Sequence, residues 1–130
     1  TVMPGSSLYD FGDAIRVGAA TQAEDCPQPE RMHLNPALFD AFVRGYITGA
    51  RGKLTGEEIR RMPWGAWIMT VENGIRFLTD YIEGDVYYRI HRPDQNLDRA
   101  RAQFALAADI ESKWKELTEI TEKYQNIQEG

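Results

Sequence analysis

The chain has 130 residues, of which 42% are hydrophobic and 27% are charged, a composition typical of one globular domain. Its formal net charge is −5, and 15 basic residues are interleaved with 20 acidic ones, so no concentrated basic surface is available for nucleic acid. Apolar runs such as residues 66–69 are too short to span a bilayer, and we expect no secretory leader. We therefore predict a single domain over residues 1–130, without a nucleic-acid or membrane partner.

Two helices separated by a polar loop are predicted in the first part of the chain. Residues 9–20 carry apolar side chains at helical spacing, and Asp10 can cap the first turn. The loop that follows contains the single cysteine, Cys26, which we expect to be an unreactive thiol in a reducing compartment, the cytoplasm. Asn35 then provides an N-cap, and a proline the first helical position, for a second helix over residues 36–51.

A short helix and a long helix are predicted next. Thr55 and Glu58 form a capping box for a short helix that ends at Pro63. A long helix follows over residues 64–83, with Gly84 at the position of a left-handed C-cap. Its predicted buried face is the apolar stripe Trp64, Trp67, Ile68, Val71, Ile75, Leu78 and Ile82. The place of the two tryptophans in this stripe favours a core role over a sugar platform.

The last part of the chain is predicted to be a link and a final helix. Residues 85–90 alone have a strand-like composition, and they could form an extended link or a helical turn instead. Residues 94–125 read as one helix, in which Asp94 is better explained as a cap and His91 as a loop histidine. The predicted fold is therefore all-α, with about five helices and no substantial sheet.

Two segments match parts of protein-kinase motifs but lack the neighbouring residues and the spacing that those motifs require. Residues 10–12 read Asp-Phe-Gly, but they run into helix-like sequence without the later activation-loop signals. Residues 91–94 read His-Arg-Pro-Asp, which places the aspartate one position late for a catalytic loop, and Asn96 follows too closely. Phosphate-loop, zinc-pair and nucleophile-elbow motifs are also missing. We predict no catalytic and no metal-binding residue in this chain.

A polar face remains to be explained. Glu72, Arg76 and Asp80 follow one another at i,i+4 spacing, and Tyr87 and Tyr88 come just beyond the glycine turn. One interpretation is a solvated face with two weak surface ion pairs. The other is one wall of a polyol pocket, because a guanidinium offers fixed donors to sugar hydroxyls and a tyrosine offers an apolar ring with a hydroxyl.

Several segments together resemble phosphotransferases of the aminoglycoside and choline kinase type, particularly the N-acetylhexosamine 1-kinase branch, whose members are sometimes labelled mucin-desulfating proteins. The segments are YDFGDAIR at residues 9–16, the helix over residues 38–49, GIRFLTDY at residues 74–81 and NLDRAR at residues 96–101. The resemblance implies a C-terminal helical subdomain of a protein-kinase-like fold. It also implies that a metal-binding aspartate immediately precedes Thr1. The missing N-terminal part of the same protein, which would carry that aspartate, is then an expected partner of this chain.

The resemblance further implies a role for individual residues. Arg76 and Tyr87, with Tyr88 as the less favoured neighbour, would contact an N-acetylhexosamine whose anomeric hydroxyl is phosphorylated. Asp10 and Asp13 would be structural residues near the active site. ATP and Mg would serve the parent enzyme, whereas this fragment would bind no cofactor and be inactive alone. Residues 91–95 depart from the family pattern, which leaves the exact sugar open.

A second hypothesis from another class is a stand-alone helical protein-interaction module with no catalytic role. Its final helix would dock a partner through the side that carries Leu97, Phe104 and Trp114. An arginine and a tyrosine on the polar face would then have no role in sugar binding.

Overall fold

The structure is a computed structural model that describes the backbone of residues 4–129 and the side chains of residues 7–126. Over this range the chain forms six α-helices, one short 3-10 helix and no strand, so the all-α prediction is confirmed. The elements are α1 (Pro4–Gly18), η1 (Pro29–Arg31), α2 (Pro36–Ala50), α3 (Gly56–Arg60), α4 (Met62–Ile82), α5 (Gln95–Ser112) and α6 (Trp114–Glu129). Thr1 lies outside the described residues.

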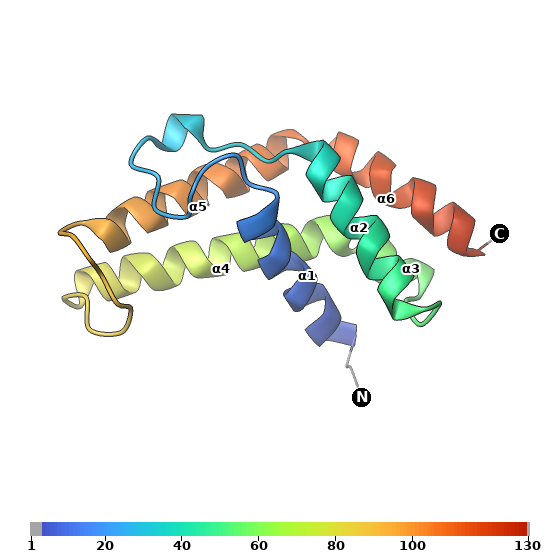
Figure 1. The fold of residues 1–130 in the computed structure, drawn as a ribbon, viewed down its shortest axis with the longest axis horizontal. Helices are drawn as coiled ribbons and strands as arrows, with labels where there is room; N and C mark the ends of the chain where they lie inside the picture. The colour runs from blue at the N-terminus through green and yellow to red at the C-terminus, as the bar shows by residue number, and fades with distance from the viewer. Residues whose placement is uncertain (1–3, 130) are drawn as a thin grey trace.

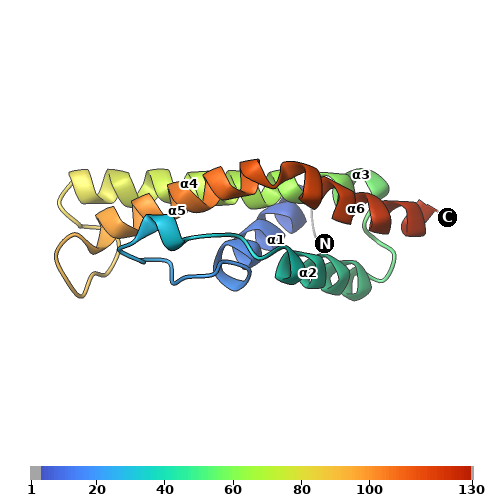
Figure 2. The same cartoon turned by 90° about the horizontal axis from the view of Figure 1, so that it is seen from above.

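The helices form two layers. The long helices α4 and α5 lie side by side, and α6 follows α5 after a short break at which the chain bends away from the axis of α5 (Figure 1). Seen from above, α1 and α2 form a second layer against this one, with α1 crossing α4 (Figure 2). No helix within residues 4–129 has the length and apolar character that a membrane crossing requires.

The core lies between the two layers. Phe11 of α1 is fully buried, and its ring meets the rings of Phe39 and Tyr46 edge-on, at centroid distances of 5.7 and 5.2 Å. Such edge-to-face pairs add to the stabilisation from burial alone. The largest fully buried apolar side chains come from nearly every element: Phe11, Ile15, Met32, Leu34, Phe39, Val43, Ile59, Met62, Leu106, Ile110 and Leu117.

The crossing of α1 and α4 depends on two glycines. A Cβ atom built on Gly12 would lie 2.2 Å from the carbonyl oxygen of Gly65, and one on Gly65 would lie 2.7 Å from the carbonyl oxygen of Leu8. The two backbones are therefore in direct contact, which only glycine permits. The glycine in the Asp-Phe-Gly imitation thus has a packing role.

The predicted N-terminal caps of α2 and α3 are confirmed. The side chain of Asn35 accepts hydrogen bonds from the N–H groups of Ala37 and Leu38, at 2.9 and 3.2 Å. Thr55 and Glu58 form the reciprocal capping box of α3, at 3.1 and 3.0 Å. These interactions satisfy N–H groups that the first turn of a helix leaves unpaired.

The predictions for the first and the last helix need correction. Helix α1 begins at Pro4, so Asp10 lies in its middle and does not cap its first turn. The final helix is two helices, α5 and α6, which makes six instead of five. The break falls at Lys113, whose Nζ reaches the Leu34 carbonyl at 2.8 Å and the Asp109 carboxylate at 2.6 Å. The spacing of apolar residues along a helix cannot predict such a tertiary contact.

The buried face of α4 also differs from the prediction. Trp64, Ile75 and Ile82 are 41%, 53% and 74% exposed, whereas small residues such as Gly65 and Thr70 are buried. The reason is that α1 and α5 both approach α4 closely, and small side chains allow that approach. The predicted core role is therefore wrong for Trp64, while Trp67 is half-buried and packs against the core.

Two loop regions complete the fold. Cys26 belongs to a loop, as expected, and its thiol is buried against the core, where it contacts the Gln28 carbonyl at 3.5 Å and the Gln22 side chain at 4.0 Å. Residues 85–90 form neither a strand nor a helical turn, so the alternative of a link between α4 and α5 is the correct one.

Candidate functional site

A shallow open cavity of about 440 Å³ lies where α4 ends and the link over residues 83–94 begins. It is lined by Ile75, Arg76, Thr79, Asp80, Glu83, Tyr87 and Tyr88. The structure thus brings Arg76 and Tyr87 onto one cavity, although one lies in a helix and the other in the link. We call this space the Arg76 cavity.

Arg76 lines this cavity and is the one arginine among the described residues of its lining. Its Nη2 contacts the Glu72 carboxylate at 2.5 Å, and its side chain is still 60% exposed. An exposed i,i+4 pair of this kind contributes little stability. Apart from this weak pair, the guanidinium makes no hydrogen bond with the described residues, so its other N–H groups are available to a ligand.

Two tyrosines provide an aromatic wall. The rings of Tyr87 and Tyr88 meet edge-on at 4.9 Å, and Tyr88 lies against Phe77 of α4 at 4.8 Å. Tyr87 is 82% exposed, whereas Tyr88 is half-buried. Neither hydroxyl has a hydrogen-bond partner among the described residues. The pair presents apolar ring surface together with two unused hydroxyl groups.

Asp80 anchors this wall and does not belong to the surface ladder that the spacing suggested. It is 3% exposed, and its carboxylate accepts hydrogen bonds from the N–H groups of Tyr87 and Tyr88, at 2.7 and 3.0 Å. A third bond comes from the Asn96 amide at 2.8 Å. Burial raises the pKa of Asp80, but the hydrogen bonds from Tyr88, Tyr87 and Asn96 outweigh it and hold the pKa below its ordinary value.

The link bends sharply to reach Asp80. Gly84 has φ of 98° and Asp85 has φ of 61°, both in the left-handed region, as the predicted C-cap at Gly84 requires. The Asp85 N–H donates to the Asp80 carbonyl at 2.8 Å. This turn brings Tyr87 and Tyr88 back over the last turns of α4.

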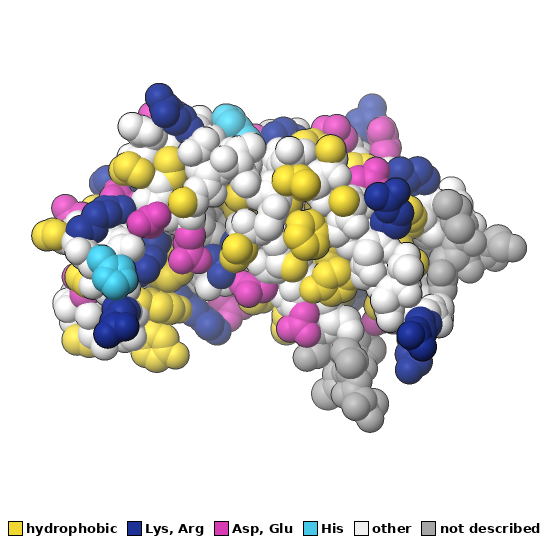
Figure 3. Space-filling view, in the orientation of Figure 1, with side chains coloured by type: hydrophobic (Ala, Val, Ile, Leu, Met, Phe, Trp, Pro, Cys, Tyr) yellow, Lys and Arg dark blue, Asp and Glu magenta, His cyan; other side chains and the backbone are white. Residues whose placement is uncertain are grey.

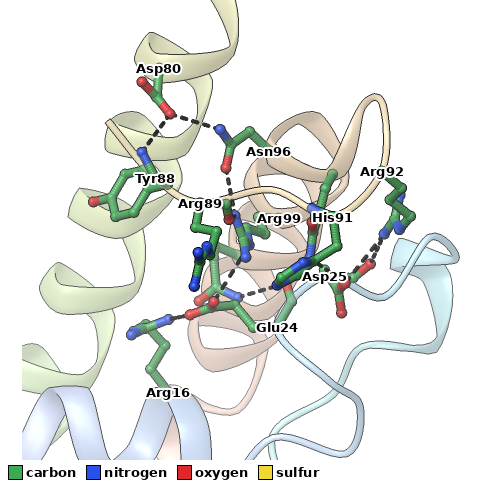
Figure 4. Close-up of polar contacts among 12 residues, drawn as sticks. Arg16, Glu24, Asp25, Asp80, Tyr88, Arg89, His91, Arg92, Asn96 and Arg99 are labelled. Atoms are coloured by element: carbon green, nitrogen blue, oxygen red, sulfur yellow. Dashed lines mark hydrogen bonds and ion pairs between the residues drawn. The ribbon is translucent and has the colours of Figure 1, made fainter. Parts of the chain in front are cut away.

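A buried polar chain connects the wall to the rest of the molecule (Figure 4). Asn96 is fully buried, and its amide oxygen accepts a hydrogen bond from Arg99 at 2.8 Å. The Arg99 guanidinium lies over the Phe77 ring, 5.5 Å from its centroid, and within 3.8 Å of the Glu24 carboxylate. Glu24 also pairs with Arg16 of α1. The cavity wall is thereby tied to three helices and one loop.

Asn96 and Arg99 are the residues that sequence analysis missed. Both belong to the NLDRAR segment, which was singled out only for its resemblance. Their polar groups lie on the buried side of α5, and a polar residue there signals an internal network. Periodicity alone could not reveal that side, because α5 has few large apolar residues.

Asp10 and Asp13 do not line the Arg76 cavity. Both are exposed on α1, and Asp13 pairs with Arg16 at 2.9 Å. Asp10 lines a different cavity of about 390 Å³ between α1 and α2, and its carbonyl accepts a hydrogen bond from the Tyr46 hydroxyl at 3.3 Å. Their predicted place near an active site stays a prediction.

The segment that imitates a catalytic loop has structural contacts. Asp94 occupies the N-cap position of α5, but its side chain does not cap the helix and instead accepts a hydrogen bond from the Tyr81 hydroxyl at 3.0 Å. Asp94 therefore occupies the predicted N-cap position, but the predicted capping hydrogen bond is not formed. The backbone of Asp94 has φ of 63°, in the left-handed region, whereas a capping residue has extended backbone. The His91 N–H donates to the Gln95 side chain at 2.6 Å.

Among the described residues, no group of three or more histidine, cysteine, aspartate or glutamate side chains could hold a metal ion. No known protein family model matches this chain.

Proposed function

We propose that the chain is the substrate-binding helical portion of an ATP-dependent sugar phosphotransferase that phosphorylates the anomeric hydroxyl of an N-acetylhexosamine. The observation that carries the proposal is the shared position of Arg76 and Tyr87 on one cavity. The sequence pattern and the family resemblance both point to these two residues, which lie in different structural elements. Their convergence is the arrangement that a common ligand would require.

The chemistry of the cavity suits a polyhydroxylated ligand with an acyl group. The Arg76 guanidinium can donate to sugar hydroxyls or to an acyl carbonyl. The exposed ring of Tyr87 can cover an apolar face of the sugar, and its hydroxyl can both donate and accept. Asp80 fixes the backbone of Tyr87 before a ligand arrives, which lowers the cost of ordering the wall on binding.

The proposal assigns the remaining parts of the enzyme to another segment of the protein. The Arg76 cavity is open on one side, so this chain would supply one wall of the sugar site. A preceding segment would supply the opposite wall, the catalytic and metal-binding aspartates, and the site for ATP and Mg. This chain alone would then bind the sugar weakly and transfer no phosphate.

An apolar face could receive that preceding segment. Apolar side chains gather over α1 and α2 on the face of the molecule shown in Figure 3. Tyr9, Val17 and Leu38 on these helices are 46%, 63% and 41% exposed. A face of this kind is typical of a surface that another part of a protein covers. Asp10 and Asp13 lie on the same layer, where they would meet it.

The test is the kinetics of Arg76→Ala in the full-length enzyme. Loss of charged donors to the sugar should raise KM for the N-acetylhexosamine about tenfold or more, with KM for ATP unchanged. Arg44→Ala is the matched control, since Arg44 is an exposed helical arginine that does not line the Arg76 cavity. An unchanged KM for the sugar would contradict the proposal and would leave Arg76 as part of a surface ion pair with Glu72.

The interaction-module hypothesis has less support. Its docking side would combine Leu97, Phe104 and Trp114, but the helix break at Lys113 separates Trp114 from the other two. Phe104 lies over Gly74, where a Cβ atom would meet its ring at 2.8 Å. Both Phe104 and Trp114 are 38% exposed, and they belong to different helices, α5 and α6. A sugar-binding role remains the better supported proposal.

A further inference from the structure

A second cavity lies near the other end of α4. It has a volume of about 450 Å³ and is lined by Arg60, Arg61, Pro63, Trp64, Trp114, Thr118 and Glu122, from α3, α4, α6 and the residue between α3 and α4. We call it the tryptophan cavity. Trp64 and Thr79 are separated by fifteen helical residues, which corresponds to about 22 Å along α4, so one small sugar cannot occupy both cavities.

Two indole rings converge on the tryptophan cavity. Trp64 and Trp114 are 41% and 38% exposed, and neither indole N–H donates a hydrogen bond within the described part of the chain. The third tryptophan behaves differently, because the indole N–H of Trp67 donates to the Glu111 carboxylate at 2.7 Å. Two large aromatic side chains from different helices thus leave ring surface and a polar handle unused in the same cavity.

Polar groups surround the indoles on both sides. Arg60 and Arg61, which line the cavity, share the Glu57 carboxylate, at 2.5 and 3.0 Å. Helix α6 contributes Thr118 and Glu122 to the lining. The rim therefore offers cationic donors, a hydroxyl and a carboxylate acceptor around an aromatic floor.

The charge balance selects the class of ligand. The lining carries two guanidiniums, of Arg60 and Arg61, and one carboxylate, of Glu122. Glu57 does not line the cavity, but it pairs with both arginines and brings the local charge close to neutral. A polyanion such as a nucleotide would place phosphate near the Glu122 carboxylate and would meet guanidiniums already paired with Glu57. A neutral polyol has no such conflict and can use donors and acceptors alike.

We propose that the tryptophan cavity is a binding site for a neutral saccharide, with pyranose rings lying on Trp64 and Trp114 and hydroxyls hydrogen-bonded to the arginines, Thr118 and Glu122. Its volume falls within the range of small-molecule sites, about 300–1,000 Å³. The proposal does not rest on the function proposed for the Arg76 cavity, because the two cavities share no residue.

The test is NMR titration of the 15N-labelled chain, which gives one indole N–H signal for each tryptophan. The probes are lactose, maltose and chitobiose, with AMP at the same concentrations as the anionic comparison. With at least one disaccharide, the signals of Trp64 and Trp114 should shift and saturate with a dissociation constant of about 1 mM, while the Trp67 signal stays in place. Trp114→Leu should weaken binding about tenfold or more.

Two further variants keep the test decisive. Glu122→Ala changes an exposed residue of the lining and should weaken the same titration even if Trp114→Leu fails to fold. Arg76→Ala should leave it unchanged, which separates this site from the Arg76 cavity. The proposal is overturned if no disaccharide up to about 20 mM gives a saturable shift. Tighter binding of AMP than of every disaccharide would also overturn it, and would assign the cavity to aromatic anions.

Discussion

Asp80 is the residue on which the geometry of the Arg76 cavity depends most. Its buried carboxylate accepts from two backbone N–H groups and from the Asn96 amide. Removing an acceptor leaves the buried donors without partners, which costs more than the hydrogen bonds themselves contribute. A change at Asp80 should therefore loosen the link that carries both tyrosines.

We expect Asp80→Asn to lower the melting temperature and to disorder the link, because an amide NH₂ group would face N–H donors. Hydrogen exchange should be faster at the backbone amides of Tyr87 and Tyr88, while the amides of α2 keep their protection. Glu83→Gln, at an exposed residue of the same cavity, is the control. Unchanged exchange at both tyrosines would mean that Asp80 does not hold the link.

Three aspartates should make the stability dependent on pH in acid. A hydrogen bond from Tyr124 lowers the pKa of Asp40. Burial raises the pKa of Asp80 and of Asp109, but the hydrogen bonds that each carboxylate accepts lower it by more, so the pKa of both is below its ordinary value. In each case the folded state binds the proton less readily than the unfolded state. Their contribution is present above the unfolded pKa of about 3.9 and is lost as pH falls through the folded pKa.

Urea unfolding at about pH 7 and about pH 3 measures this effect, and the midpoint should be lower at the acidic pH. Asp109→Asn should reduce the difference between the two midpoints, since it removes the carboxylate that holds Lys113 and Leu34. A difference as large as in the wild-type protein would show that Asp109 does not contribute to it.

At the level of helices, glycine contacts set the angle and distance between α1 and α4. Gly12→Ala would push a methyl group against the Gly65 carbonyl, where the space is 2.2 Å, and should destabilise the protein by about 3 kcal/mol. Gly45→Ala on α2 is the matched control, because no atom lies within 4 Å of a Cβ there. That change should stabilise the helix by about 0.5–1 kcal/mol. Thermal unfolding measures both effects. If the melting temperatures of the two variants changed in the same direction, close contact between Gly12 and Gly65 would not be what sets the crossing of α1 and α4.

The starts of the helices were predictable because their signals are local. Asn35 and the Thr55–Glu58 capping box act within one turn, so sequence spacing alone identifies them. The end of α5 was not predictable in the same way. It coincides with a contact of Lys113 with the Leu34 carbonyl, 79 residues away in the sequence. Periodicity on both sides of Lys113 is compatible with one continuous helix.

The whole molecule presents two cavities toward the two ends of α4 and an apolar layer formed by α1 and α2. The Arg76 cavity is an open wall, and the described residues hold no cluster of metal ligands. Phosphoryl transfer depends on positioned phosphates and metal ions. The proposal accordingly assigns the ATP and metal sites to a further segment of the protein.

The chain alone is accordingly expected to transfer no phosphate. Incubation with ATP, magnesium and N-acetylglucosamine should give sugar phosphate only at the level of buffer, whereas the full-length enzyme should give product. Chain carrying Arg76→Ala serves as the control for traces of a contaminating kinase, since a contaminant would act equally in both samples. Product formed by the wild-type chain and abolished by Arg76→Ala would contradict the expectation.

The sequence by itself determined the all-α class, the caps of α2 and α3 and the pairing of Arg76 with Tyr87 as candidate ligand contacts. These features depend on residues within a few positions of one another or on a resemblance between segments. Only the tertiary structure decided which face of α4 is buried, that Asp80 supports the tyrosine wall and that Trp64 faces a cavity. The physical reason is that burial depends on which helices approach one another, and small residues such as Gly12 and Gly65 permit an approach that apolar periodicity does not reveal.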